Sequence, residues 1–151
     1  MPVSERELGA KIVSVIASSV LGAALFIGIP LSSRIGSFSQ AAIFTSLVCA
    51  IAAVLGLIFG VPGVMLVDKF LPRFKARYVV AAPICALLAW LAFEGAFSPG
   101  AWIKVWTSPS FWFGWAPRRA GIMLFIGLAV GAFYMLIWPR IGRMMKVNTA
   151  L

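Results

Sequence analysis

The stretch AAIFTSLVCAIAAVLGLIFGVPGVMLV, residues 41–67, decides the fold of this chain. It contains no charged side chain, and about 20 apolar residues in a helix are enough to cross the hydrocarbon core of a bilayer. The segment therefore predicts a membrane-spanning helix that is long enough to tilt. Its GVPG sequence, residues 60–63, predicts a kink, because Pro62 removes a backbone hydrogen-bond donor and crowds the preceding turn.

Three further apolar segments accompany this one, at residues 12–31, 78–97 and 120–138. The chain of 151 residues is 62% hydrophobic and 11% charged, and its mean hydropathy is +1.03. A soluble domain averages about 45–50% apolar and about 25% charged residues. We therefore expect an all-α integral membrane protein, with four transmembrane helices in an up-down bundle. Residues 1–151 would form a single four-span domain, with no soluble domain.

The basic residues predict how the helices are oriented. In a four-span arrangement, nine of the thirteen Lys and Arg residues lie on the side of the two termini and of the connection at residues 68–77. Cytoplasmic connections carry an excess of Lys and Arg, so we expect both termini in the cytoplasm, and a bacterial inner membrane as the location. The net charge of +9 is explained by contacts with lipid headgroups, and we expect no nucleic-acid partner.

Side chains that carry chemistry are scarce. The chain has no histidine, and both cysteines, Cys49 and Cys85, fall within predicted spans. Hydrolysis inside a membrane requires paired aspartates, a serine with a base, or metal ligands. The one aspartate, Asp68, falls in the predicted cytoplasmic connection. We therefore expect no enzymatic activity, no metal site and no cofactor.

Glu94 is the acidic residue inside a predicted span. It lies four residues before Ser98, which places it only about 6 Å from the end of its helix. An ionisable residue at membrane depth indicates an ion pair or a functional site. The sequence favours a structural pair with a basic residue on its side of the membrane, which could be Arg34, Lys104, Arg118 or Arg119. A polar cavity or transport site, and a contact with lipid or a partner, are the alternatives.

The connection AWIKVWTSPSFWFGWAPRR, residues 101–119, holds four of the six tryptophans. We expect a short interfacial helix between Ser98 and Pro109, followed by an aromatic belt at the membrane boundary. Arg118 and Arg119 lie at the predicted start of a helix, which already carries partial positive charge, so we expect an anion beside them. It could be a lipid phosphate, Glu94 or a carboxylate of a partner. The predicted lipid or partner contacts are Trp102, Trp106, Phe111, Trp112, Phe113, Trp115, Arg118 and Arg119.

Two GxxxG patterns predict close helix packing, Gly56 with Gly60 and Gly127 with Gly131. Two glycines on one helix face allow another backbone to approach closely. The patterns favour packing between helices of this chain, and association with a partner helix is the alternative. Ser18 and Gly22 repeat the small-residue spacing more weakly.

These features favour a noncatalytic integral membrane protein that acts by protein–protein binding. It would be a small accessory subunit of a larger membrane complex, or a membrane immunity or exclusion factor. Membrane lipids and a membrane-protein partner, or a second copy of the chain, are its expected partners. The alternative is a small transporter or channel that functions as an oligomer, with Glu94 in the pathway. A third possibility is lipid recognition through the aromatic connection.

Overall fold

A computed structural model describes residues 5–74, 76–97, 107–114 and 116–145 of the chain. These residues form helices and no strand, so the all-helical prediction is confirmed for the described part. Four of the helices are long and apolar enough to cross a membrane, and they coincide with the four predicted segments. They cover Glu5–Ser32, Phe38–Phe70, Arg77–Glu94 and Ala116–Met144.

The first two long helices each contain a π-helical turn. The first consists of α1 (Glu5–Ala23), η1 (Ala24–Gly28) and α2 (Ile29–Ser32). The second consists of α3 (Phe38–Leu55), η2 (Gly56–Gly60) and α4 (Val61–Phe70).

Each π turn ends two residues before a proline, Pro30 in α2 and Pro62 in α4. A proline crowds the carbonyl group of the preceding turn, and a π turn widens the backbone there. Accordingly, Ile29 N–H donates to the carbonyl of Ala24, and Val61 N–H donates to that of Gly56. The sequence predicted a kink at residues 60–63, and the structure has a π turn at Gly56–Gly60, just before that stretch continues as α4.

The helices extend beyond the predicted spans. The first begins at Glu5 instead of residue 12, the second ends at Phe70 instead of residue 67, and α8 covers Ala116–Met144. Asp68 consequently lies in the last turns of α4, and its assignment to a connection was wrong. An apolar run marks only the part of a helix that hydrocarbon can surround, whereas these helices continue where charged side chains pair with one another.

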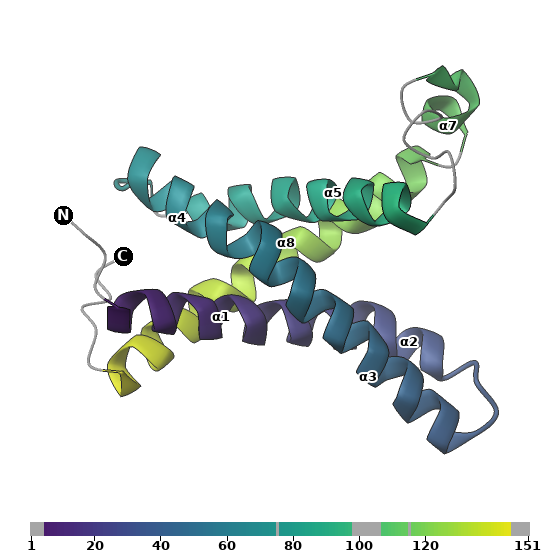
Figure 1. Ribbon diagram of the computed structural model, residues 1–151, viewed down its shortest axis with the longest axis horizontal. Coiled ribbons are helices and arrows are strands. Elements are labelled where there is room, and N and C mark those ends of the chain that lie inside the picture. Colours follow the sequence, from purple (N-terminus) through teal and green to yellow (C-terminus); the bar gives the residue numbers. More distant parts are fainter. Residues whose placement is uncertain (1–4, 75, 98–106, 115, 146–151) are drawn as a thin grey trace.

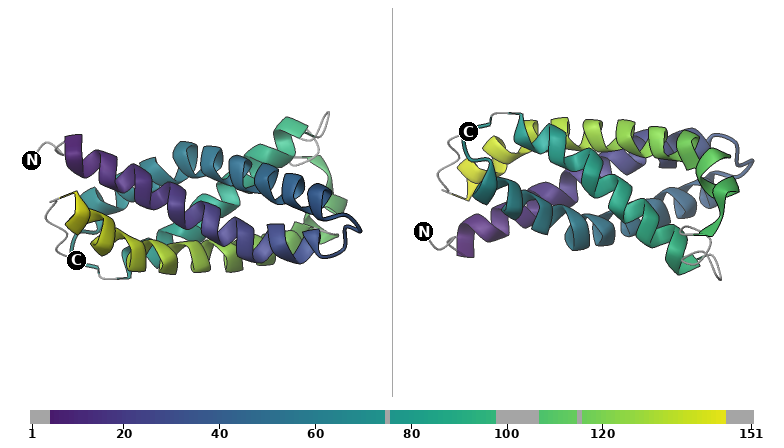
Figure 2. Two further views of the ribbon diagram at one scale, coloured as in Figure 1. Left: turned by 90° about the horizontal axis from the view of Figure 1, so that it is seen from below. Right: turned by 90° about the horizontal axis from the view of Figure 1, so that it is seen from above.

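The long helices contact one another in a ring. Helix α8 packs mainly on α5 (Arg77–Phe97) and on α1. Helix α3 packs on α1, whereas η2 and α4 provide the contacts of the second long helix with α5. The start of α1, the end of α4, the start of α5 and the end of α8 lie at one end, which we call the polar end (Figures 1 and 2). The connection of α2 to α3 and the short α7 (Pro109–Phe113) lie at the opposite end, the aromatic end.

Glycines bring these helices close together. A Cβ atom on Gly127 would lie 2.5 Å from Cα of Pro83, and one on Gly131 would lie 2.7 Å from the carbonyl oxygen of Tyr78. Both contacts are between α8 and the backbone of α5, which cannot move aside as the end of a side chain can. A Cβ atom on Gly60 would meet Val15, one on Gly56 would meet Ser19, and one on Gly22 would meet Val130. Both GxxxG patterns thus lie at helix contacts within the chain.

Candidate functional site

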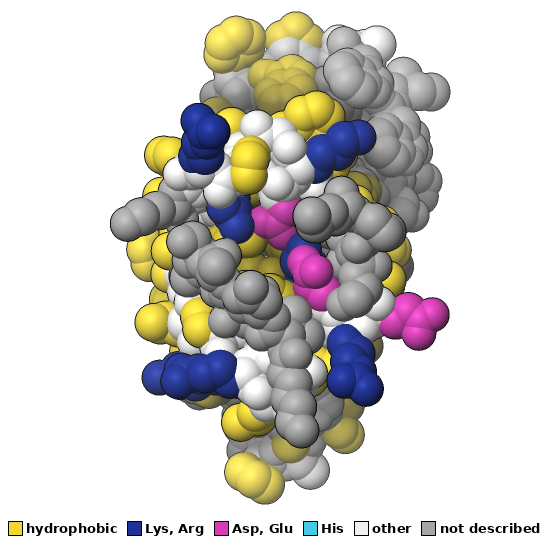
Figure 3. Space-filling view, turned by 90° about the vertical axis from the view of Figure 1, so that its left-hand side faces the viewer, with side chains coloured by type: hydrophobic (Ala, Val, Ile, Leu, Met, Phe, Trp, Pro, Cys, Tyr) yellow, Lys and Arg dark blue, Asp and Glu magenta, His cyan; other side chains and the backbone are white. Residues whose placement is uncertain are grey.

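Five polar side chains from three helices meet at the polar end, and we call them the polar cluster: Glu7, Lys11, Asp68, Arg77 and Tyr78. Lys11 Nζ lies 2.7 Å from Glu7 Oε1 and 2.9 Å from Asp68 Oδ2. Arg77 Nε lies 3.0 Å from Asp68 Oδ1, an ion pair whose geometry is not that of a hydrogen bond. The Tyr78 hydroxyl donates to the same oxygen. Figure 3 views this end of the molecule, with acidic side chains near its centre and basic ones around them.

The cations of this cluster are buried. Lys11 is 4% exposed and Arg77 is 8% exposed, and a charge removed from water is tolerated only when it is paired and hydrogen-bonded. Arg77 also donates to the carbonyl of Pro72 and to the Tyr78 hydroxyl. Asp68 of α4 pairs with Lys11 of α1 and with Arg77 of α5, so the cluster links these three helices at the polar end.

Sequence reasoning did not find this cluster. It treated Lys11 and Arg77 as charges that set orientation and placed Asp68 in a connection. One local signal was present, because Glu7 and Lys11 are four residues apart and face each other on a helix. The contact of Lys11 with Asp68 joins residues from different helices, and the sequence pattern carries no sign of it.

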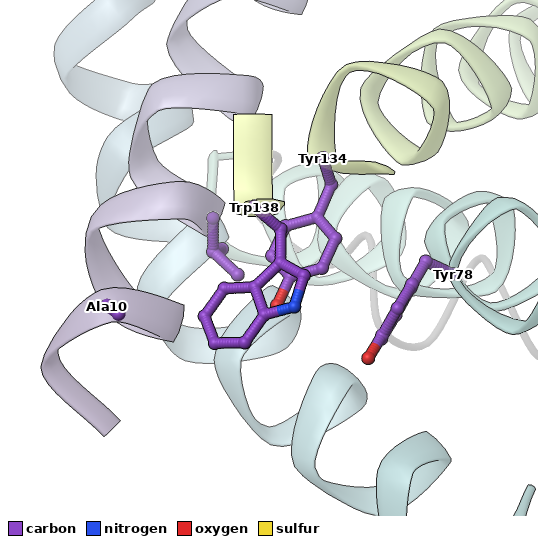
Figure 4. Close-up of a cluster of buried hydrophobic side chains, with 5 residues drawn as sticks. Ala10, Tyr78, Tyr134 and Trp138 are labelled. Carbon is purple, nitrogen blue, oxygen red and sulfur yellow. The ribbon is translucent and has the colours of Figure 1, made fainter. Parts of the chain in front are cut away.

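A layer of aromatic side chains lies next to the polar cluster (Figure 4). The rings of Tyr78 and Tyr134 have centroids 4.8 Å apart, and Tyr134 stacks on Trp138 with centroids 6.1 Å apart. Ala10 and Val15 of α1 complete this buried group. The Tyr134 hydroxyl is buried and has no hydrogen-bond partner among the described residues. The layer separates the charges of the polar end from the interior of the bundle.

A cavity of about 330 Å³ lies inside the bundle, and we call it the inner cavity. All four long helices line it, and no charged side chain of a described residue does. Ser18 is one of its few polar residues, and its hydroxyl donates to backbone carbonyls of its own helix at Ser14 and Val15. The lining on α5 comprises Tyr78, Ala81, Ala82, Cys85, Ala86, Ala89, Trp90 and Phe93. These positions follow one face of the helix.

The inner cavity is least covered between α3 and α5. Helix α3 contains no buried residue, and its lining side chains, such as Val48 and Leu55, are only half-buried. In Figure 1 the start of α3 and the end of α5 diverge toward the aromatic end. We infer that the cavity opens sideways there, at the height of the apolar helix surfaces.

Glu94 and Arg119 form an ion pair at the aromatic end. Glu94 Oε1 lies 2.5 Å from Arg119 Nη1 and accepts a hydrogen bond of 3.3 Å from Trp90 Nε1. The Glu94 side chain is 15% exposed and that of Arg119 is 54% exposed. The structure therefore brings together Glu94 and one of the arginines that the sequence offered as its partner. Glu94 is not among the residues that line the inner cavity.

The aromatic connection is described only in part. Trp112 and Phe113 are exposed on α7, and Arg118 is exposed near the start of α8. Helix α7 covers residues for which the sequence predicted an aromatic run and no helix. Trp102, Trp106, Trp115, the side chain of Phe111 and the interfacial helix predicted between residues 98 and 109 lie outside the described residues, except for the last positions before Pro109.

No protein-family model, curated protein or solved structure matches this chain.

Proposed function

We propose that the four long helices cross a membrane in alternate directions, with the polar end in the cytoplasm of a bacterium. The helix ends that meet at the polar end support this (Figure 2), because they carry described basic residues at the start of α1, at the end of α4, at the start of α5 and at the end of α8. Reporter fusions test it. A phosphatase that is active only outside should be active after residue 35 and inactive after residue 74. The opposite pattern would overturn the orientation.

We propose that the protein is a noncatalytic binding protein, a small accessory subunit of a larger membrane complex. The observation that supports this is how little of the second long helix is buried by the rest of the chain. Only 6% of its most apolar window is buried within the chain, against 22–33% for the other three. Ile43, Leu47 and Val54 are large, exposed and spaced so that they share one face of α3. An apolar helix of a partner would cover this face, and an immunity or exclusion factor would use it in the same way.

Transport through Glu94 receives no comparable support. The carboxylate is paired with Arg119, and Glu94 is not itself a lining residue of the inner cavity, whose described lining carries no charge. An ion pathway requires polar groups that replace the hydration shell of the ion.

Crosslinking at α3 tests the binding proposal. A photo-reactive amino acid replaces Leu47 on α3 or, as a control, Leu128 on α8. Both are exposed leucines, because Leu47 is 57% exposed and Leu128 is 46% exposed. In native membranes we expect a protein adduct from position 47 and none from position 128. An adduct of twice the chain mass would identify the partner as a second copy. Equal adducts at both positions, or none at position 47, would contradict the proposal.

A further inference from the structure

The shape of the inner cavity limits what fills it. Its lining on α5 runs from Tyr78 to Phe93, which corresponds to about 22 Å along a helix. The cavity volume is only about 330 Å³, and a helix with its side chains is about 10–12 Å across. A partner helix of this length is too thick for a cavity of that volume. A single extended hydrocarbon chain is much thinner than a helix and suits the long, narrow shape better.

The chemistry of the lining agrees with such a chain. The described lining is apolar apart from a few hydroxyl groups, and the Ser18 hydroxyl is already bonded to its own backbone. Side chains around an empty space lose dispersion contacts, so an apolar molecule that fills it is bound favourably. In a membrane the molecules beside α3 and α5 would be lipids, and an acyl chain would reach the cavity from there without passing through water.

Positive charge lies at the end of the inner cavity where the headgroup would be. Met123 lines the cavity, and Arg119 is one helical turn before it at the aromatic end. Arg118 is exposed and forms no ion pair with a described residue. Two guanidinium groups and the positive end of a helix outweigh the single carboxylate of Glu94. Guanidinium and helix N-terminal N–H groups both recognise phosphate oxygens, so these donors suit a phosphate group.

We propose that the inner cavity binds one acyl chain of a phospholipid, with its phosphate at Arg118 and Arg119. The acyl chain lies between the four long helices, and the lipid headgroup lies at the aromatic end. This site is separate from the exposed face of α3 that we propose for a partner, because the cavity residues face inward. A lipid in the cavity would therefore stay bound when no partner is present. If no lipid binds, the crosslinking test at position 47 still decides the partner proposal on its own.

Native mass spectrometry of the full chain in mild detergent tests this site. Bound lipid is first removed from the protein by detergent exchange. The protein is then titrated with dioleoyl phosphatidylglycerol, and with oleate and dioleoylglycerol as probes that have no phosphate. We expect one phosphatidylglycerol per chain, and weaker binding of both other probes. No bound phosphatidylglycerol, or equal binding of all three, would overturn the proposal.

Two substitutions that fill the inner cavity give the decisive comparison. Ala52→Leu on α3 and Ala89→Leu on α5 both place a larger side chain in the lining. Each should lower the affinity for phosphatidylglycerol about tenfold, because a filled site has no room for the chain. Ala132→Leu is the control, since Ala132 is exposed on α8 and lies outside the lining. The two cavity positions lie on different helices, so if one variant does not fold, the other still tests the site. Equal affinity in that variant and the control would refute the site.

The arginines are tested separately. Arg118→Gln removes one guanidinium and leaves the pair of Arg119 with Glu94 in place. It should weaken phosphatidylglycerol binding about tenfold and leave dioleoylglycerol binding unchanged, because only the former has a phosphate. Equal losses for both lipids would show that Arg118 does not hold the phosphate, and would overturn that part of the proposal.

Discussion

Replacing Asp68 by Asn removes the negative charge that the polar cluster shares among three helices. Lys11 Nζ is 2.9 Å from this carboxylate and Arg77 Nε is 3.0 Å from it, and both cations are almost completely buried. Removing one partner of a buried ion pair costs about 3–5 kcal/mol, because the other charge stays buried without compensation. Lys11 keeps Glu7 and Arg77 keeps the Pro72 carbonyl, so we expect about 3 kcal/mol, the lower end of that range.

The measurement is the free energy of unfolding of the purified protein in mixed micelles, titrated with sodium dodecyl sulfate. Near-ultraviolet circular dichroism reports the transition, since Trp138 and Tyr134 pack beside the cluster. Glu94→Gln is the matched control, because it removes one carboxylate from an ion pair whose arginine is half exposed. Such a pair contributes only about 0–1 kcal/mol. Equal losses for Asp68→Asn and Glu94→Gln would refute the reasoning.

A second comparison identifies the source of the loss. Lys11→Met combined with Asp68→Asn removes a cation and an anion together, so less uncompensated charge stays buried than in either single variant. The double variant should lose less stability than the two single losses combined, by about 0.5–3 kcal/mol. Strict additivity would mean that Lys11 and Asp68 contribute independently, contrary to their contact.

Two further comparisons use pairs of similar residues. Gly127→Ala should destabilise by about 1–3 kcal/mol in the same unfolding assay, because its Cβ would meet the backbone at Pro83. Gly121→Ala, with nothing within 4 Å of its Cβ, should stabilise by up to about 1 kcal/mol through helix propensity. Tyr78→Phe should cost about 1.5–3 kcal/mol, because it removes a hydrogen bond to the Asp68 carboxylate. Tyr134→Phe should cost nothing, because its hydroxyl has no partner among the described residues, and a loss as large as that of Tyr78→Phe would contradict this explanation.

The helices could be predicted from the sequence because four apolar segments are each long enough to cross hydrocarbon, and a helix is the structure that such segments favour. The segment at residues 41–67 lies within Phe38–Phe70, and each of the other predicted spans likewise lies within a long helix. The ends were less predictable. Lys11 and Asp68 interrupt an apolar pattern, yet both lie within helices because each satisfies the charge of the other. A rule that reads one segment at a time does not contain that pairing.

The candidate site was predictable only where residue types restricted the possible partners. Glu94 is near the end of its helix, and few cations lie on that side, so a pair with an arginine could be expected. The inner cavity could not be predicted, because it depends on how far apart α3 and α5 lie. That separation follows from packing around glycines such as Gly60 and Gly127, whose positions a sequence gives but whose neighbours it does not.

The two ends of the bundle differ in what holds the helices together. At the polar end, buried charges join α1, α4 and α5, and separating them would leave those charges without partners. At the aromatic end, the ion pair of Glu94 with Arg119 joins only α5 to α8, and α3 is held mainly by its packing on α1. Movement of α3 away from α5 therefore breaks none of the four ion pairs found among the described residues. The side of the inner cavity between α3 and α5 is thus the side through which we expect a lipid chain to enter.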